Sequence, residues 1–272
     1  MTRRPHAYAG AGRPIEGDVA DPLGLASALA GQDAAYYLVH SLDAPDFVDR
    51  DRQGAAAFAS AATEAGVRQV IYLGGLGDDS DALSQHLRSR REVEGVLANA
   101  APTTVLRAGI VIGDGGISWE ILCQLIERLP VMVTPRWVQT RCQPIAVADA
   151  IAFLGGVLGR ADAIGATFEI GGPEALTYRE MLETVAGLTG RRRLIVPVPL
   201  LSPRLSSHWL RLITDVDLAT AQALVDSMTN EVVVRDRRIE ALLGHRPMRF
   251  REAAIEALEA RQRRREHHAP TA

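Results

Sequence analysis

Apolar runs alternate with amphipathic segments over the first 158 residues of the chain. Three runs are continuous and of strand length: AAYYLVH (34–40), QVIYLGG (69–75) and TTVLRAGIVIG (103–113). Three segments carry apolar positions at helical spacing: 46–66, 84–100 and 118–129. Strands that are apolar on both faces and separated by helices predict a parallel sheet covered on both sides. The predicted fold class is therefore α/β, with a doubly wound parallel sheet.

Individual residues predict where some of these helices and strands begin or end. Asp21 followed by Pro22 predicts a helix N-cap with proline at the first helical position. The segment 15–17, ahead of Asp18, reads as a short buried strand with an acid at its tip. Ser118 is the expected cap of the helix over 118–129, and Thr177 with Glu180 predicts a capping box.

The pattern changes after Leu158. A strand ending in prolines near residue 197 suits a sheet edge, and residues 203–260 read mostly as helix. We therefore divide the chain into a sheet domain (1–160), a smaller and mostly helical region (161–260) and a charged tail (261–272).

Composition and charge limit the classes of partner that this protein is expected to bind. The 272 residues are 47% hydrophobic and carry a net charge of −3, which argues against nucleic acid or an anionic membrane as the main partner. Cys123 and Cys142 have neither the spacing of metal ligands nor a disulfide framework, so we expect no metal and a reducing compartment. The start of the chain lacks the apolar core of a signal peptide, and no apolar run has the length of a membrane span. The expected location is the cytoplasm.

A nucleotide-binding sheet is expected to open with a strand, a glycine-rich turn and a helix. Three glycine clusters are candidates: 10–17, 74–81 and 113–118. The first lacks a preceding strand, the second holds three aspartates that would repel phosphate, and the third has the best setting but contains Asp114. A plain turn or coil is the alternative at each.

The order of segments is similar to that of a known family. GDVADPLGLASALAGQDAAYYLVHS, GVRQVIYLGGLG, LSQHLRSRREVEGVL, VLRAGIVIG and QPIAVADA follow one another as in the atypical short-chain dehydrogenase/reductases, and resemble their NmrA-like, NAD(P)-binding branch. The resemblance implies a Rossmann-like sheet, NAD or NADP as cofactor, and a small-molecule substrate. That family opens with a strand, a Gly-x-x-Gly-x-x-Gly turn and a second strand, so the expectation is that the chain starts late and that cofactor binding is weakened or lost.

The resemblance also implies cofactor contacts at ten positions. They are Asp18, Val19, Val39, His40, Ser41, Gly74, Gly75, Arg107, Ala108 and Gly109. Asp18 would lie beside the adenine, or would serve only as a turn aspartate. His40 and its neighbours would lie near the ribose and nicotinamide, or would be ordinary polar residues at a strand end. The same resemblance places Arg136, Trp137 and Arg141 on the substrate side and gives Asp149 a helix-capping role.

The catalytic positions depart from the family. Its serine after the fifth strand is replaced here by Gly74-Gly75, and its Tyr-x-x-x-Lys by His86-Leu-Arg-Ser-Arg90. His86 and Arg90 share one helical face, so His86 is a candidate acid and Arg90 a candidate ribose or phosphate contact. A solvated helix face is the alternative. An oxidoreductase with replaced catalytic groups, a non-catalytic NAD(P)H-binding redox sensor or assembly factor, and a chain that binds no nucleotide all remain open.

Overall fold

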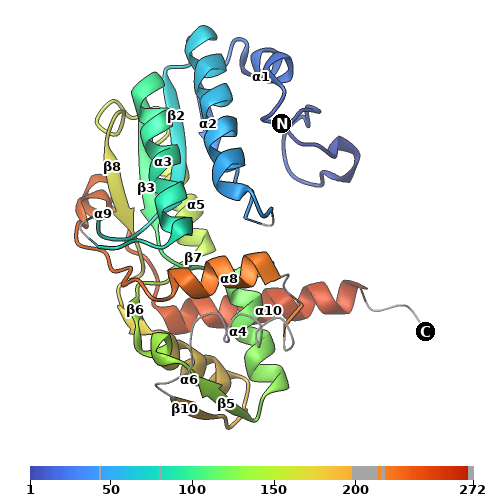
Figure 1. Ribbon diagram of the computed structural model, residues 1–272, viewed down its shortest axis with the longest axis vertical. Helices are drawn as coiled ribbons and strands as arrows, with labels where there is room; N and C mark the ends of the chain where they lie inside the picture. Colours follow the sequence, from blue (N-terminus) through green and yellow to red (C-terminus); the bar gives the residue numbers. More distant parts are fainter. Residues whose placement is uncertain (43, 80, 198–213, 216–217, 269–272) are drawn as a thin grey trace.

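The computed structural model describes residues 1–42, 44–79, 81–197, 214–215 and 218–268. Figure 1 shows an elongated molecule with two lobes, one built around the larger sheet and one around α4, α6, α8 and α10. The sheet lobe comes first in the chain, and α9 returns to it from the C-terminal half (Figure 1).

The larger sheet has four strands and is wholly parallel. Its order is β1 (Ala34–Tyr37), β2 (Gln69–Gly75), β3 (Thr103–Ala108) and β8 (Thr167–Ile170). Among the described strands, only β2 pairs with β1, and Tyr36 and Leu38 at this edge are 39% and 52% exposed. The parallel sheet expected from the apolar runs is therefore confirmed.

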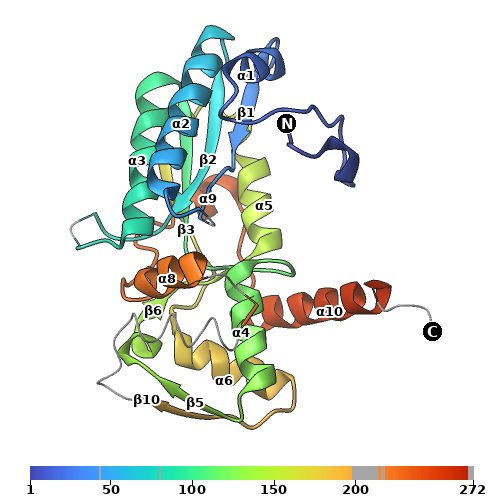
Figure 2. The same cartoon turned by 45° about the vertical axis from the view of Figure 1, so that its right-hand side comes forward.

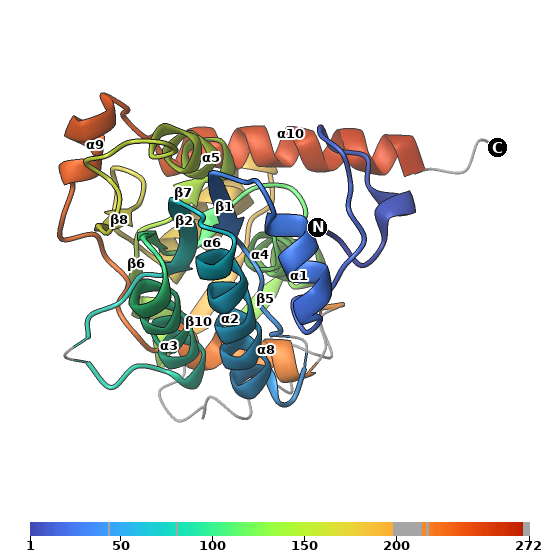
Figure 3. The same ribbon diagram turned by 90° about the horizontal axis from the view of Figure 1, so that it is seen from above.

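Helices cover both faces of this sheet, as Figure 3 shows from above. α1 (Pro22–Leu29), α2 (Phe47–Glu64) and α3 (Gln85–Ala100) pack on one face. α5 (Val147–Gly156) and α9 (Arg238–Leu243) pack on the other. Each face has its own buried cluster, and the doubly wound arrangement is confirmed.

The second lobe is mostly helical. Its helices are α4 (Ile117–Arg128), α6 (Tyr178–Leu188), α8 (Leu218–Ser227) and α10 (Phe250–His268). Small two-stranded sheets join β5 (Val131–Thr134) to β10 (Leu194–Pro197), β4 (Val111–Ile112) to β7 (Ile145–Ala146), and β6 (Arg141–Cys142) to β9 (Leu176–Thr177). The 3₁₀ turns are η1 (Pro5–Ala7) and η2 (Arg136–Gln139). Figure 2 shows α4 and α10 crossing beneath the larger sheet. The edge strand expected near residue 197 is present, while part of the helical expectation for 203–260 lies outside the described residues.

Several local predictions are confirmed by hydrogen bonds. The Asp21 side chain accepts from Leu23 N at the start of α1, and both halves of the Thr177–Glu180 capping box form. Ser84 caps α3 by accepting from Leu87 N. Each of these residues satisfies a backbone N–H that has no partner within its helix.

Other local predictions are wrong. Residues 15–17 form no strand of the sheet, because their only ladder contact is an isolated bridge between Glu16 and Thr2. The run 103–113 breaks into β3 and β4 around Gly109. Ser118 is not the cap of α4, since the helix begins one residue earlier and Gly116 is its N-cap. Asp149 does not cap α5; it accepts from Met248 N and contacts His245 Nε2 at 2.9 and 2.8 Å.

The charged tail is part of a long helix. α10 crosses the expected boundary at residue 261, and Arg261 in it is 5% exposed. Its guanidinium donates to Glu120 at 2.9 Å and to both oxygens of Glu127. Arg264 pairs with Asp114 and Glu120. The tail therefore attaches to α4 through ion pairs between residues far apart in sequence.

Candidate functional site

A large cavity lies beside the carboxyl end of β1. Its volume is about 670 Å³, and it brings together five predicted cofactor residues: Asp18, Val19, Val39, His40 and Ser41. The same cavity is lined by residues 1–3 and by the side of α2 that carries Gly54 and Ala57. Ligands of doubly wound sheets bind outside the carboxyl ends of the strands, and this volume is typical of a ligand site.

Asp18 organises the turn at one side of this cavity. Its Oδ1 accepts from Ala20 N at 3.0 Å, and its carboxylate lies 4.0 Å from Arg3 Nε. The turn role that the sequence left open is therefore present. The side chain is 45% exposed, so the carboxylate is also accessible to a ligand, and contact with adenine remains a prediction.

A buried carboxylate fixes the loop after β1. Asp51 on α2 is 4% exposed, and its Oδ1 accepts from Ser41 N at 2.7 Å. Its Oδ2 lies 3.5 Å from Ser89 Oγ on α3. Sequence reasoning missed Asp51, although its spacing from Phe47 and Ala55 places a carboxylate on the apolar face of α2.

Arg90 lies under the same strand ends and is only 7% exposed. Its Nη2 lies 3.5 Å from the carbonyl oxygen of Val39, and its Cζ lies 5.8 Å from the centre of the Tyr72 ring. Its Nε is buried and has no hydrogen-bond partner among the described residues. The solvated-face alternative is therefore wrong for Arg90. A buried donor without a partner is uncommon in proteins.

A second cavity, of about 140 Å³, continues the site toward the second lobe. Gly75, Ala108 and Gly109 line it together with His86. A Cβ on Gly75 would lie 2.9 Å from Leu87 Cδ2, and one on Gly109 would lie 3.0 Å from the carbonyl oxygen of Gln143. These glycines therefore leave room for neighbouring protein atoms, and a larger side chain at either position would clash with them.

His86 is half-buried on the first turn of α3. Burial lowers its pKa to about 4, helped by the positive charge of Arg90 and by His40. The imidazole is therefore neutral near pH 7. Such a ring can accept a proton or donate a hydrogen bond, but it is not the charged acid that the spacing from Arg90 suggested. Proton transfer by His86 remains a prediction.

We expect a proton NMR titration of the histidines to give His86 a pKa near 4, assigned by its loss in His86→Gln. Because this pKa lies below the unfolded value of about 6.5, the unfolded chain binds more protons between these pH values. Stability should therefore fall as the pH drops through that window. Arg90→Ala should raise the pKa of His86, because it removes a nearby positive charge. A pKa near 6.5 in the folded protein would contradict this environment.

Other predicted positions do not converge on these cavities. The Arg107 side chain pairs with Glu94 at 2.6 Å and Asp79 at 3.3 Å, so only its backbone is at the strand end. Gly74 lines neither cavity; a Cβ there would meet the Tyr72 ring at 3.0 Å. On the substrate side, Trp137 is buried while Arg136 and Arg141 are exposed.

The three glycine clusters have different surroundings. At 113–118, Asp114 is bound by Arg264 of α10. At 74–81, the carboxylate of Asp79 is held by Arg91 and Arg107. Segment 10–17 forms neither helix nor strand, and Tyr8 Oη donates to Ala11 O at 2.6 Å.

Comparisons with known proteins indicate the class of the N-terminal domain. Residues 2–122 match a family model described as NAD(P)H-binding. The chain is 29% identical over 143 residues to subunit 9 of the NADH dehydrogenase [ubiquinone] 1 alpha subcomplex, mitochondrial, of Arabidopsis thaliana, and 26% identical over 145 residues to that of Mus musculus. The matches cover 50% and 53% of this chain, and the chain spans only 35% and 38% of those relatives.

Solved structures share the fold. An NADPH-dependent quinone oxidoreductase from Escherichia coli, solved with NADPH, is 20% identical with a TM-score of 0.70 over 90% of this chain and 83% of that one. The triphenylmethane reductase of Citrobacter sp., solved with NADP(H), is 16% identical with a TM-score of 0.72 over the same shares. MoeE5, solved with UDP-glucose and NAD, is 20% identical with a TM-score of 0.71 over 96% and 89%.

Residues 2–122 are therefore an NAD(P)H-binding domain, and the fold is Rossmann-like. The NAD(P)-binding class of this domain, with NAD or NADP as its cofactor class, is confirmed at this level. Within the described part of the chain, no helix is both long and apolar enough to span a membrane.

Proposed function

We propose that this protein binds NAD or NADP across the two cavities at the carboxyl ends of β1, β2 and β3, and acts as an atypical short-chain oxidoreductase on a small molecule. The observation that carries the proposal is the convergence of predicted cofactor residues on these cavities: Asp18, Val19, Val39, His40 and Ser41 line one, and Gly75, Ala108 and Gly109 line the other. The chain covers only part of its curated relatives, so their activity does not carry over to it.

When bound, the nicotinamide supplies hydride transfer. The Arg90 guanidinium would supply a positive charge and hydrogen-bond donors near the ribose. The backbone at Gly75 and Gly109, which lines the smaller cavity, would flank the ring. Neutral His86 would hold a proton or hydrogen bond at an imidazole nitrogen beside the substrate.

A non-catalytic NAD(P)H sensor or assembly factor is the second candidate. The absent Ser and Tyr and the low pKa of His86 favour it, because the site then lacks an evident proton donor on α3. The curated relatives are subunits of a larger enzyme. Turnover with a panel of carbonyl compounds separates the two, since only the oxidoreductase consumes NADPH or NADH.

Titration of NADPH and NADH, followed by their fluorescence, tests binding itself. We expect saturable binding that Arg90→Ala weakens about fivefold, the size of one lost hydrogen bond. Arg88→Ala is the matched control, because Arg88 is exposed on the same helix and its guanidinium contacts the Leu83 carbonyl oxygen, whereas that of Arg90 contacts Val39. Absence of saturation with either nucleotide, or equal losses in both variants, would refute the proposed site.

The cytoplasm is the location we propose, supported by the two free cysteines. The curated relatives are named mitochondrial, so mitochondria are the alternative. Fractionation of cells that express the tagged chain distinguishes the two.

A further inference from the structure

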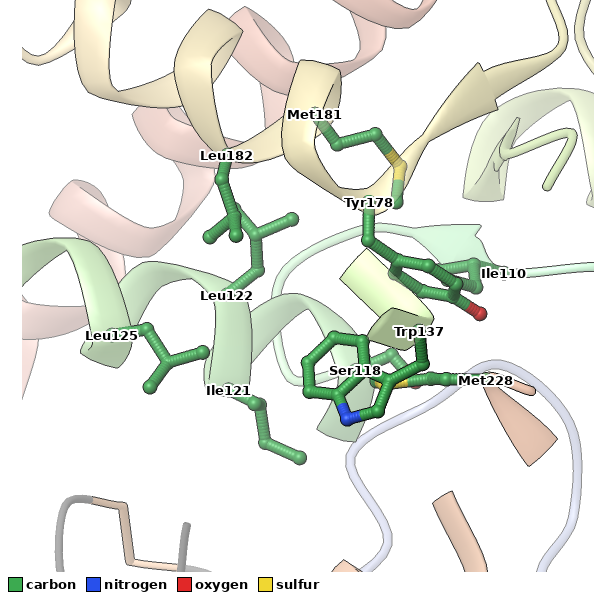
Figure 4. Close-up of a pocket in the computed structure, with 10 residues that line it drawn as sticks. All are labelled: Ile110, Ser118, Ile121, Leu122, Leu125, Trp137, Tyr178, Met181, Leu182 and Met228. Carbon is green, nitrogen blue, oxygen red and sulfur yellow. The ribbon is translucent and has the colours of Figure 1, made fainter. Parts of the chain in front are cut away.

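A small apolar cavity opens between α4, α6 and the turn at Trp137. Its volume is about 30 Å³, and Figure 4 shows the ten residues that line it: Ile110, Ser118, Ile121, Leu122, Leu125, Trp137, Tyr178, Met181, Leu182 and Met228. Four of these, Ile110, Ser118, Tyr178 and Met228, also line the 140 Å³ cavity that contains His86. The two cavities therefore share a wall, and the apolar one extends the proposed site away from the sheet.

The lining of this apolar cavity does not suit a charged or strongly polar ligand. None of the ten residues in Figure 4 carries a charge, and most present only carbon or sulfur atoms. A diphosphate or carboxylate would lose its hydration there without gaining a cation. The combined space is also below that of a typical drug-sized site, which limits the occupant to a compact molecule.

Tyr178 supplies the polar handle. It is 6% exposed, its ring meets Trp137 edge to face with centroids 5.8 Å apart, and its hydroxyl makes no hydrogen bond to a described residue. Figure 4 shows the hydroxyl on the side of Ile110, a residue that both cavities share. Burial raises the pKa of Tyr178 well above its usual value, so the group remains an O–H donor.

We propose that this cavity, together with the adjoining 140 Å³ cavity, binds a compact, uncharged and largely apolar molecule with one hydrogen-bond acceptor, which receives the Tyr178 O–H. The apolar body lies among Leu122, Met181 and Met228, and the acceptor faces the His86 cavity. The assignment of this molecule as the substrate depends on the proposed function. Its binding in the cavity does not.

Methyl NMR of protein labelled at the methionine methyl groups tests the cavity without nucleotide. Acetophenone and ethylbenzene have similar size, but only the ketone has an acceptor. We expect acetophenone to shift the Met181 and Met228 signals and to leave Met132, which is buried outside the cavity, unchanged. Ethylbenzene should bind more weakly, and uridine diphosphate should not shift these signals. Equal binding of ketone and hydrocarbon, or shifts caused only by uridine diphosphate, would overturn the proposal.

Tyr178→Phe isolates the hydroxyl. We expect it to weaken acetophenone binding about fivefold and to leave ethylbenzene unchanged. Equal weakening of both probes would assign Tyr178 a packing role only. If the variant does not fold, the comparison of acetophenone with ethylbenzene in the unaltered protein still tests whether the cavity prefers a molecule with an acceptor. NADPH titration of the same sample separates the two proposals, because failure there with ketone binding intact would refute only the dinucleotide site.

Discussion

Replacing Ala57 with glutamate is expected to weaken NADPH and NADH binding by more than tenfold. Ala57 is half-buried on α2 and lines the 670 Å³ cavity, where the added carboxylate would face a dinucleotide's diphosphate. At an effective dielectric constant of 20, two like charges about 5 Å apart repel by roughly 3 kcal/mol. The added side chain also occupies space in the cavity. Titration by nucleotide fluorescence measures the change.

Ala56→Glu is the matched control. Ala56 is the preceding residue on the same helix, is exposed and does not line the cavity. Ala56→Glu adds the same charge and the same change in helix propensity. Because exposed charges are screened, the NADPH and NADH affinity of this variant should stay within about twofold of that of the unaltered protein. Equal affinities in the two variants would place the nucleotide elsewhere.

Arg261→Ala is expected to lower the free energy of unfolding by about 3 kcal/mol. The Arg261 side chain is 6% exposed and bridges Glu120 and Glu127 of α4, so its loss leaves these partly buried carboxylates with only the more exposed Arg264 and Arg265 as partners. Because both glutamates keep some exposure, the value is at the lower end for broken buried pairs. Urea unfolding at pH 7 measures it.

Arg263→Ala is the control on the same helix, since Arg263 is exposed and lies 3.8 Å from Glu259. It should cost less than about 0.5 kcal/mol. Near-equal losses in the two variants would contradict the role of Arg261 in attaching α10.

The same cluster gives stability a dependence on acid. Partial burial would raise the pKa of Glu127, but hydrogen bonds from Arg261 and Arg265 outweigh this and lower it to about 2. The folded pKa thus lies below the unfolded value of about 4.3, so this contribution is present above pH 4.3 and is lost as the pH falls toward 2. Arg261→Ala should reduce that loss.

Much of the sheet lobe follows from local sequence. The run 69–75 predicts β2 to the residue, because a strand buried on both faces must be apolar throughout. Ile15 also suggests a strand over residues 15–17. A strand exists only where another strand pairs with it, however, and no window of sequence reveals that partner. The ion pairs of Arg261 are likewise hidden, since their partners lie more than 130 residues away.

The site was partly predictable for the same reason. Residues at strand ends, such as His40 and Gly109, are located by the pattern that locates the strands. Tyr178 gave no such signal, because the sequence shows it only as the first residue of a capped helix. Its role depends on α4 and η2 meeting α6, which is a matter of packing between distant segments.

A crystal structure of the protein soaked with NADPH tests the central claim most directly. We expect nucleotide density that runs from Asp18 and His40 past the Val39 carbonyl, which Arg90 contacts, to the backbone at Gly109. Density seated on the turn at 113–118, or none at saturating NADPH, would contradict it.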